Sequence, residues 1–124
     1  MTRSDVAREF GPDAVDELDR ILALCAEAAD VVARGREAFV AERLLRRAAE
    51  AIIMHIGESS SRPRLDAFKA RHAFLGDPRG WQIVKDTANF YDHQYADVDA
   101  EQTWRILVTD LPALAAFIRA AIDG

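Results

Sequence analysis

Apolar residues recur at alternating steps of three and four along most of this chain, and this spacing constrains the fold more than any other feature. Between Asp13, a candidate N-cap, and Gly35, a candidate C-cap, it predicts a helix with one buried stripe. The stripe consists of Val15, Leu18, Leu22, Cys25, Ala29 and Val32. No stretch alternates with period two for long enough to form a strand. The sequence therefore predicts an all-α fold, most simply an up-and-down bundle of four to five helices.

The same spacing places the remaining helices, and turn-rich segments separate them. Gly57 to Pro63 reads as a linker after the second helix, and residues 1–12 read as a short helical lead-in. Further helices are predicted over residues 37–56, 64–75, 81–91 with an extension toward 95, and 99–122.

The last of these helices carries two local signals. Asp99, with Gln102 three residues later, has the spacing of a capping box and predicts the helix start. Pro112 falls inside the helix, where it removes a backbone donor. We therefore expect a kink or a restart near Pro112, with Thr109 or Asp110 as the new cap.

Size and charge narrow the class of protein. At 124 residues the chain predicts a single domain spanning residues 1–124, large enough to bury a core. A formal charge of −5 argues against a broad basic surface for nucleic acid but leaves room for a local basic pocket. The single cysteine, Cys25, is predicted to be a small buried residue. Without an apolar run of membrane-spanning length or a signal peptide, we expect a cytoplasmic protein that does not enter a membrane.

Chemically useful side chains gather between Trp81 and Tyr95. A helix turns about 100° per residue, so Asn89 and His93 share one face, while Ala88, Asp92 and Tyr95 lie along a neighbouring one. His93 titrates near neutral pH and suits proton transfer, with Asn89 or Asp92 available to fix its tautomer. A lone histidine on a helix is nevertheless often a surface residue or a hydrogen-bonded core residue. Catalysis and a structural role both remain open at this point.

The residue pattern does not predict a metal site or a cofactor site. His55, His72 and His93 are scattered, and no two of them have the helical spacing that would place them on one face. The chain also lacks a glycine-rich phosphate loop and a nucleophile elbow. We expect neither a metal nor a cofactor.

The residues along the second half of the chain resemble a known family. Their order is Ile56-Gly57-Glu58, Trp81, Asn89, His93, Gln94, Tyr95, Val98, Asp99, Trp104 and Leu111-Pro112. This order is similar to that of the HepT-like ribonuclease toxins of the HEPN superfamily, whose motif is written R-x4-H-x-Y. The resemblance extends over residues 13–122 and implies a HEPN-like helical bundle.

On that motif, His93 matches the catalytic histidine, Asn89 the polar residue after the arginine, and Tyr95 the tyrosine. The arginine position is Ala88. Because that arginine is thought to stabilise the scissile phosphate, the resemblance implies a chain that is inactive or weakened as written. The rest of the motif is complete, which favours a deliberate replacement of arginine over gradual loss of activity. Lys85, on the adjacent turn, could substitute in part.

The resemblance implies a metal-independent endoribonuclease that acts on RNA as a homodimer. It also implies a partner, a minimal nucleotidyltransferase antitoxin, which in some members adds AMP to the tyrosine that corresponds to Tyr95. Two other classes stay open. One is a non-catalytic helical module that binds a nucleotide or a protein in the same cleft. The other is a structural helical dimer with exposed Trp81 and Trp104 as interface anchors.

Overall fold

A computed structural model describes residues 1–77, 79–93 and 99–124, with the backbone alone for Leu75 and His93. Within these residues the chain is helical and has no strand, which confirms the all-α prediction. The elements in chain order are α1 (Arg3–Phe10), α2 (Pro12–Ala33), α3 (Arg36–Ala41), α4 (Arg43–Ser60), η1 (Pro63–Leu65), α5 (Asp66–Arg71), η2 (Phe74–Gly76), α6 (Gly80–His93), α7 (Ala100–Arg105), η3 (Ile106–Asp110) and α8 (Leu111–Asp123).

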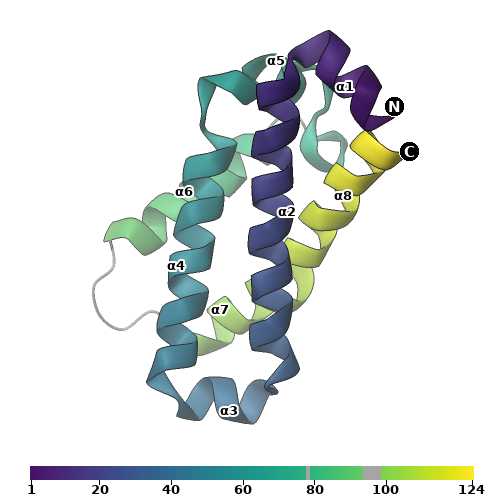
Figure 1. Cartoon of the computed structure of the whole chain (residues 1–124). Helices are drawn as coiled ribbons and strands as arrows, with labels where there is room; N and C mark the ends of the chain where they lie inside the picture. Colours follow the sequence, from purple (N-terminus) through teal and green to yellow (C-terminus); the bar gives the residue numbers. More distant parts are fainter. Residues whose placement is uncertain (78, 94–98) are drawn as a thin grey trace.

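Two long helices, α2 and α4, lie side by side and form the centre of the molecule (Figure 1). Helix α6 packs on α4, helix α8 packs on α2, and α3 crosses the end of the bundle away from α1 and α5. The two termini lie together (Figure 1), and a 3.2 Å contact between Arg3 and Asp123 links them; Arg3 also contacts Asp19 of α2 at 2.7 Å. None of the helices described here is both long enough and apolar enough to cross a bilayer.

Helix α2 follows the predicted periodicity, although its first residues differ from the prediction. Leu18 and Cys25 are buried as expected, whereas Ala29 is exposed and Val15, Leu22 and Val32 are half-buried. The buried face of α2 instead contains Ala14, Ile21, Ala28 and Val31, so the predicted stripe is wrong at four of its six positions. The predicted cap at Asp13 is wrong, because Gly11 is the N-cap and Pro12 occupies the first turn. Gly11 has a φ of 95°, a conformation that favours glycine, and Pro12 has no N–H that would need a partner there.

The predicted single helix over residues 37–56 is wrong in two respects, because it is interrupted at Glu42 and it continues beyond Ile56. Glu42 is extended, with φ −100° and ψ 111°, and separates α3 from α4. This turn brings Phe39 into the core against Trp104, with ring centroids 5.3 Å apart. Burial of an aromatic side chain outweighs the modest helix propensity of one residue. At the other end α4 continues through Gly57 to Ser60, so the predicted linker begins too early.

The predicted helix over residues 64–75 is also broken. Helix α5 ends at Arg71, and His72 leaves the helical region with φ −125° and ψ 85°. The break lets the indole N–H of Trp81 donate to the carbonyl oxygen of His72 at 2.7 Å. The His72 ring meanwhile stacks on Phe68 at 4.6 Å. Packing of aromatic rings therefore determines where α5 ends.

The C-terminal segment confirms the predicted start at Asp99 and the predicted restart near Pro112, since α8 begins at Leu111. The Asp99 carboxylate accepts from the backbone N–H of Glu101 at 2.9 Å, so it caps α7, although through a different donor than the capping box with Gln102 predicts. The wide π turn η3 ends immediately before Leu111, because Pro112 offers no N–H to the preceding turn. Asp110, one of the two predicted caps, is the N-cap residue of α8, but its backbone stays helical and its side chain makes no cap bond.

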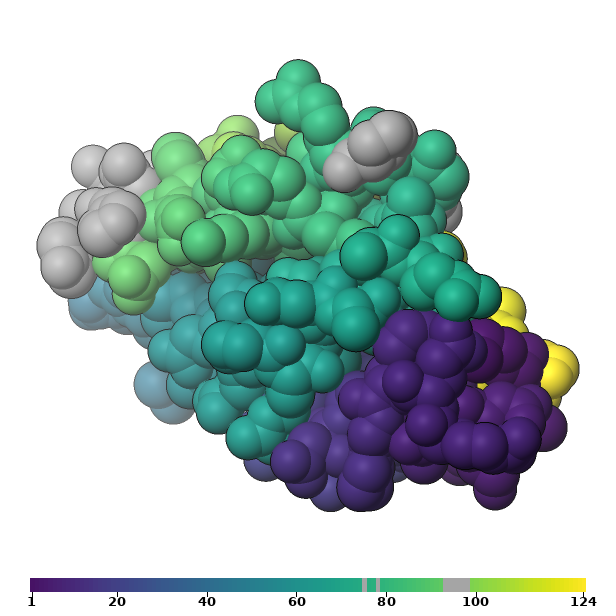
Figure 2. All heavy atoms as spheres, turned by 90° about the horizontal axis from the view of Figure 1, so that it is seen from above, coloured from purple at the N-terminus to yellow at the C-terminus, as the bar shows by residue number. Residues whose placement is uncertain are grey.

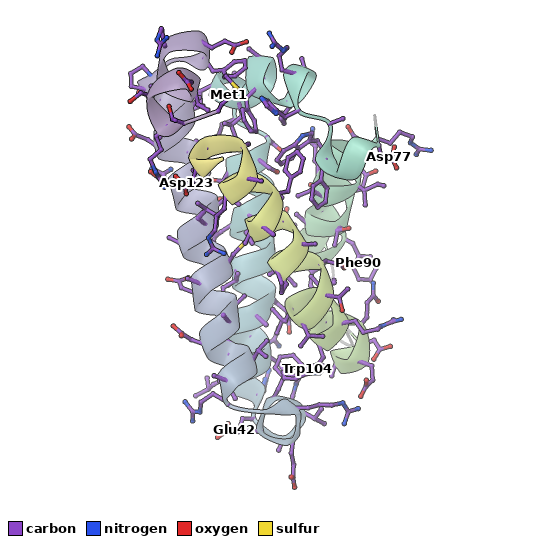
Figure 3. The ribbon with its side chains drawn as sticks, turned by 90° about the vertical axis from the view of Figure 1, so that its right-hand side faces the viewer. Met1, Glu42, Asp77, Phe90, Trp104 and Asp123 are labelled. Carbon is purple, nitrogen blue, oxygen red and sulfur yellow. The ribbon has the colours of Figure 1, made fainter. Side chains whose placement is uncertain are left out.

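The tryptophans do not fit the idea of exposed interface anchors. Trp81 is 9% exposed, and Trp104 is half-buried. Figure 3 shows Trp104 directed into the bundle next to α3, whereas Phe90 projects outward from α6. Phe90 and Ile83, at 44% and 52% exposure, are the apolar side chains that α6 presents to solvent.

Candidate functional site

Helix α6, which carries the predicted site positions Ala88, Asn89 and His93, is fixed to the bundle at both ends. Its buried stripe contains Trp81, Ala88 and Tyr91, at steps of seven and three. Trp81 holds the first turn through its bond to His72. Near the last turn, the Tyr91 hydroxyl and the Thr103 hydroxyl share a hydrogen bond of 2.8 Å. Burial raises the pKa of the Tyr91 phenol, so Tyr91 acts as a neutral anchor.

At mid-length, α6 and α4 approach each other at Gly57 and Ala88. A Cβ added to Gly57 would lie only 2.0 Å from the Cβ of Ala88, whereas carbon atoms normally stay about 3.5–4.0 Å apart. Glycine is therefore needed at position 57 for the two helices to pack this closely. Ala88 itself is 6% exposed. A longer side chain at position 88 would have to leave this contact along the groove between the helices.

That groove opens into a pocket of about 220 Å³ between α4 and α6. Lys85, Asn89 and Asp92 are exposed around Ala88 and supply a cation, an amide and a carboxylate. The lining residues are Met54, Gly57, Glu58, Ser61, Lys85, Ala88, Asn89 and Asp92. The structure therefore brings four of the predicted site residues into one pocket.

His93 and Tyr95, the other two predicted site residues, are covered only in part. The backbone of His93 forms the last residue of α6, one turn beyond Asn89. Its helical position is about 140° from that of Ala88. The side chain of His93 and the whole of Tyr95 lie outside the described residues, so their predicted roles stay predictions.

A second pocket lies on another side of α6 and has a different character. Its volume is about 370 Å³, and its lining is mainly apolar, with Ile83 and Val84 from α6 facing Ile106 and Leu111. Exposed Ile83 lies at its edge, and Phe90 follows on the same face of α6. This surface suits an apolar partner better than a phosphate.

Comparison with known families assigns the chain. A family model described as ribonuclease HepT-like matches residues 15–121. The chain belongs to the HepT-like ribonuclease family. No curated protein and no solved structure matches it significantly. The family match spans both helices of the small pocket, and the family name gives RNA as the substrate class.

The side of the pocket that α4 forms was not predicted from the sequence. Gly57 and Glu58 were assigned to a linker, whereas they lie in the last turns of α4. Met54, Glu58 and Ser61 follow one another at helical spacing and form one side of the pocket. Their spacing is visible in the sequence, but their pairing with α6 depends on the fold. Glycine in the Ile56-Gly57-Glu58 segment was the available signal, since a glycine inside a helix often marks a close packing contact.

Proposed function

We propose that this chain is a HEPN-type ribonuclease toxin whose cleavage site is built on α6 and which is inactive or weakened because Ala88 occupies the motif arginine position. The observation that carries the proposal is the pocket between α4 and α6, in which Ala88 lies between Lys85, Asn89 and Asp92. The match to a ribonuclease family supports RNA as the substrate.

An arginine at position 88 would start from a Cβ held against Gly57 and extend into this pocket. A guanidinium there offers a planar fork of donors for a phosphate, which alanine lacks. Lys85 reaches the same pocket but presents a single flexible ammonium group. Loss of the arginine therefore removes stabilisation of negative charge on the scissile phosphate.

The proposed reaction needs no metal ion. The ribose 2′-oxygen attacks the phosphorus, the bond from phosphorus to the 5′-oxygen breaks, and the products are a 2′,3′-cyclic phosphate and a 5′-hydroxyl. His93 accepts the proton from the 2′-hydroxyl or donates one to the leaving 5′-oxygen, while water serves the other oxygen. Asn89 orients the histidine or the phosphate, with Asp92 in a supporting role.

We further propose that the active form is a homodimer. On one helix, positions 88 and 93 are about 140° apart, so a site that uses both is completed more easily by two chains. Exposed Ile83 and Phe90, beside the apolar pocket of about 370 Å³, support an apolar contact between copies. If so, an Ile83→Glu/Phe90→Glu variant should sediment as a monomer at concentrations where the parent is a dimer. A monomeric parent chain would contradict this part of the proposal.

The proposed partner is a minimal nucleotidyltransferase that acts as antitoxin by adding AMP to Tyr95. The added phosphate and bulk would repel RNA by the same electrostatics as phosphorylation. This chemistry predicts that Tyr95→Phe prevents the modification. In the Ala88→Arg background, we expect the added substitution Tyr95→Phe to escape neutralisation in cells.

Toxicity in cells tests the proposal. Expression of Ala88→Arg should arrest growth and degrade RNA, whereas Ala88→Arg/His93→Ala should be harmless. An Ala88→Gln variant controls for a long polar side chain without charge and should stay harmless. A harmless Ala88→Arg chain that folds normally would contradict the proposal. Ligand binding that is indifferent to positions 88 and 93 would instead favour the non-catalytic binding module.

A further inference from the structure

A fully buried carboxylate, Glu17 of α2, organises the end of the bundle next to α1 and α5. Glu17 is 0% exposed and accepts a hydrogen bond from the Ser59 hydroxyl. Three guanidinium groups approach it: Arg20 at 3.5 Å, Arg62 at 3.4 Å and Arg64 at 3.7 Å. A buried charge is costly unless it is paired, so this carboxylate holds the three arginines in place.

The stoichiometry of this cluster is unusual for the chain. Three arginines around one carboxylate leave a local charge of +2 in a protein of net charge −5. By contrast, Arg71 pairs with a carboxylate of its own, Glu9, at 2.6 Å. The local charge of +2 makes this cluster a local basic site, which the net charge of −5 does not exclude.

The arginines retain donors for a ligand. Each guanidinium carries five N–H groups and approaches Glu17 through one nitrogen atom. The side chains are 52%, 43% and 42% exposed for Arg20, Arg62 and Arg64, so the remaining donors reach solvent. The Nε of Arg62 and the Oε1 of Glu17 are buried without a hydrogen bond, although they are 3.4 Å apart. Glu17 therefore positions the arginines while leaving most of their hydrogen-bonding capacity unused.

The cluster and the pocket at Ala88 both lie at the C-terminal end of α4, the cluster toward α2 and the pocket toward α6. Ser61 lines that pocket, and Arg62 is the next residue, with its Cα about 3.8 Å further along the chain. Figure 2 looks onto this end of the bundle, where the teal segment that follows α4 lies against the purple start of the chain. A strand of RNA that runs from the pocket past Ser61 and over the end of α4 would reach the arginines.

We propose that Glu17 holds Arg20, Arg62 and Arg64 as a binding site for the backbone phosphates of single-stranded RNA, adjacent to the pocket at Ala88. The inference rests on the proposed ribonuclease function and adds to it a second contact region that is not part of the cleavage chemistry. Arginine suits this task, because its planar fork matches phosphate oxygens. A purely structural cluster would stabilise the bundle without affecting RNA.

Binding of a short fluorescent single-stranded RNA to the chain as it stands, with Ala88, tests the site without cleavage. Arg62→Gln/Arg64→Gln should weaken binding at low salt by at least several-fold. Because each phosphate contact contributes about 0.7 to the slope of log affinity against log salt, that slope should become shallower by up to about 1.4. Arg34→Gln/Arg43→Gln, at the α3 end, makes the same change in net charge and should have little effect.

Two further measurements separate binding from stability. Thermal unfolding of each variant shows whether the pair of substitutions damages the fold, and Arg20→Gln, which leaves two arginines on Glu17, repeats the test in a milder form. Arg62→Lys/Arg64→Lys keeps the charge and should keep most of the salt slope.

Unchanged RNA affinity and slope in the glutamine variants, or an equal loss in the α3-end control, would overturn the arginine site. If Ala88→Arg still cleaves RNA, that result leaves the proposed function standing. Weakened binding specific to the arginine cluster, together with an inert Ala88→Arg chain, would support the RNA site and refute the cleavage proposal.

Discussion

Replacement of Gly57 by alanine should destabilise the protein, although helix propensity alone predicts the opposite. The new Cβ would lie 2.0 Å from the Cβ of Ala88, so α4 and α6 would have to move apart. Overpacking of this kind costs about 1–3 kcal/mol, whereas removing a glycine from a helix gains about 1 kcal/mol. For so close a contact, we expect a net loss of about 1–2 kcal/mol and a Tm lower by roughly 5 °C.

A double-mutant cycle with Ala88→Gly isolates the contact. In Gly57→Ala/Ala88→Gly the two methyl groups change places, and the new Cβ would be 3.5 Å from the Cα at position 88, an ordinary contact distance. Urea unfolding should therefore give a favourable coupling of at least about 1 kcal/mol. If Gly57→Ala is as stable as the parent, or if the two changes are additive, the close approach of α4 and α6 is refuted.

Three further predictions concern titration, reactivity and the anchoring of α6. Burial, with Arg71 as a further cause, lowers the pKa of His72 below its ordinary value of 6.5. Because the unfolded chain then binds the proton more readily, the free energy of unfolding should fall as the pH drops below about 6.5. Urea unfolding of His72→Gln should show a weaker dependence on pH. Burial raises the pKa of the Cys25 thiol to about 11, so a thiol reagent at pH 8 should react slowly with the native chain and rapidly with the unfolded one. Tyr91→Phe removes the 2.8 Å bond to Thr103 and should cost about 1 kcal/mol of unfolding free energy, whereas a change within error would show that this bond does not hold α6.

The helical class could be predicted from the sequence, because period and propensity are local properties, but the buried face of α2 was predicted only in part. Leu18, for example, occupies a predicted core position and is fully buried, whereas Ala29 was predicted to be buried and is exposed. The breaks could not be predicted in the same way. Glu42 is a good helix former, and it becomes extended so that Phe39 can reach the core.

The candidate site could also be predicted only in part. Lys85, Asn89 and Asp92 were placed near Ala88 by helical geometry alone, and they line one pocket with it. The opposite wall depends on which helix packs against α6, and no local pattern gives that pairing. The arginine cluster brings Arg62 and Arg64 to Glu17, which is distant from them in sequence, so this cluster depends on the fold.

Cleavage of RNA by the purified Ala88→Arg variant tests the central claim most directly. Restoring one charge-stabilising donor set in an active site typically changes the rate by about 10²–10³-fold, so we expect at least this increase over the Ala88 chain. The products should carry 2′,3′-cyclic phosphate ends, and the added substitution His93→Ala should abolish cleavage. A folded Ala88→Arg variant that is as inert as the parent, or cleavage that survives His93→Ala, would contradict the account.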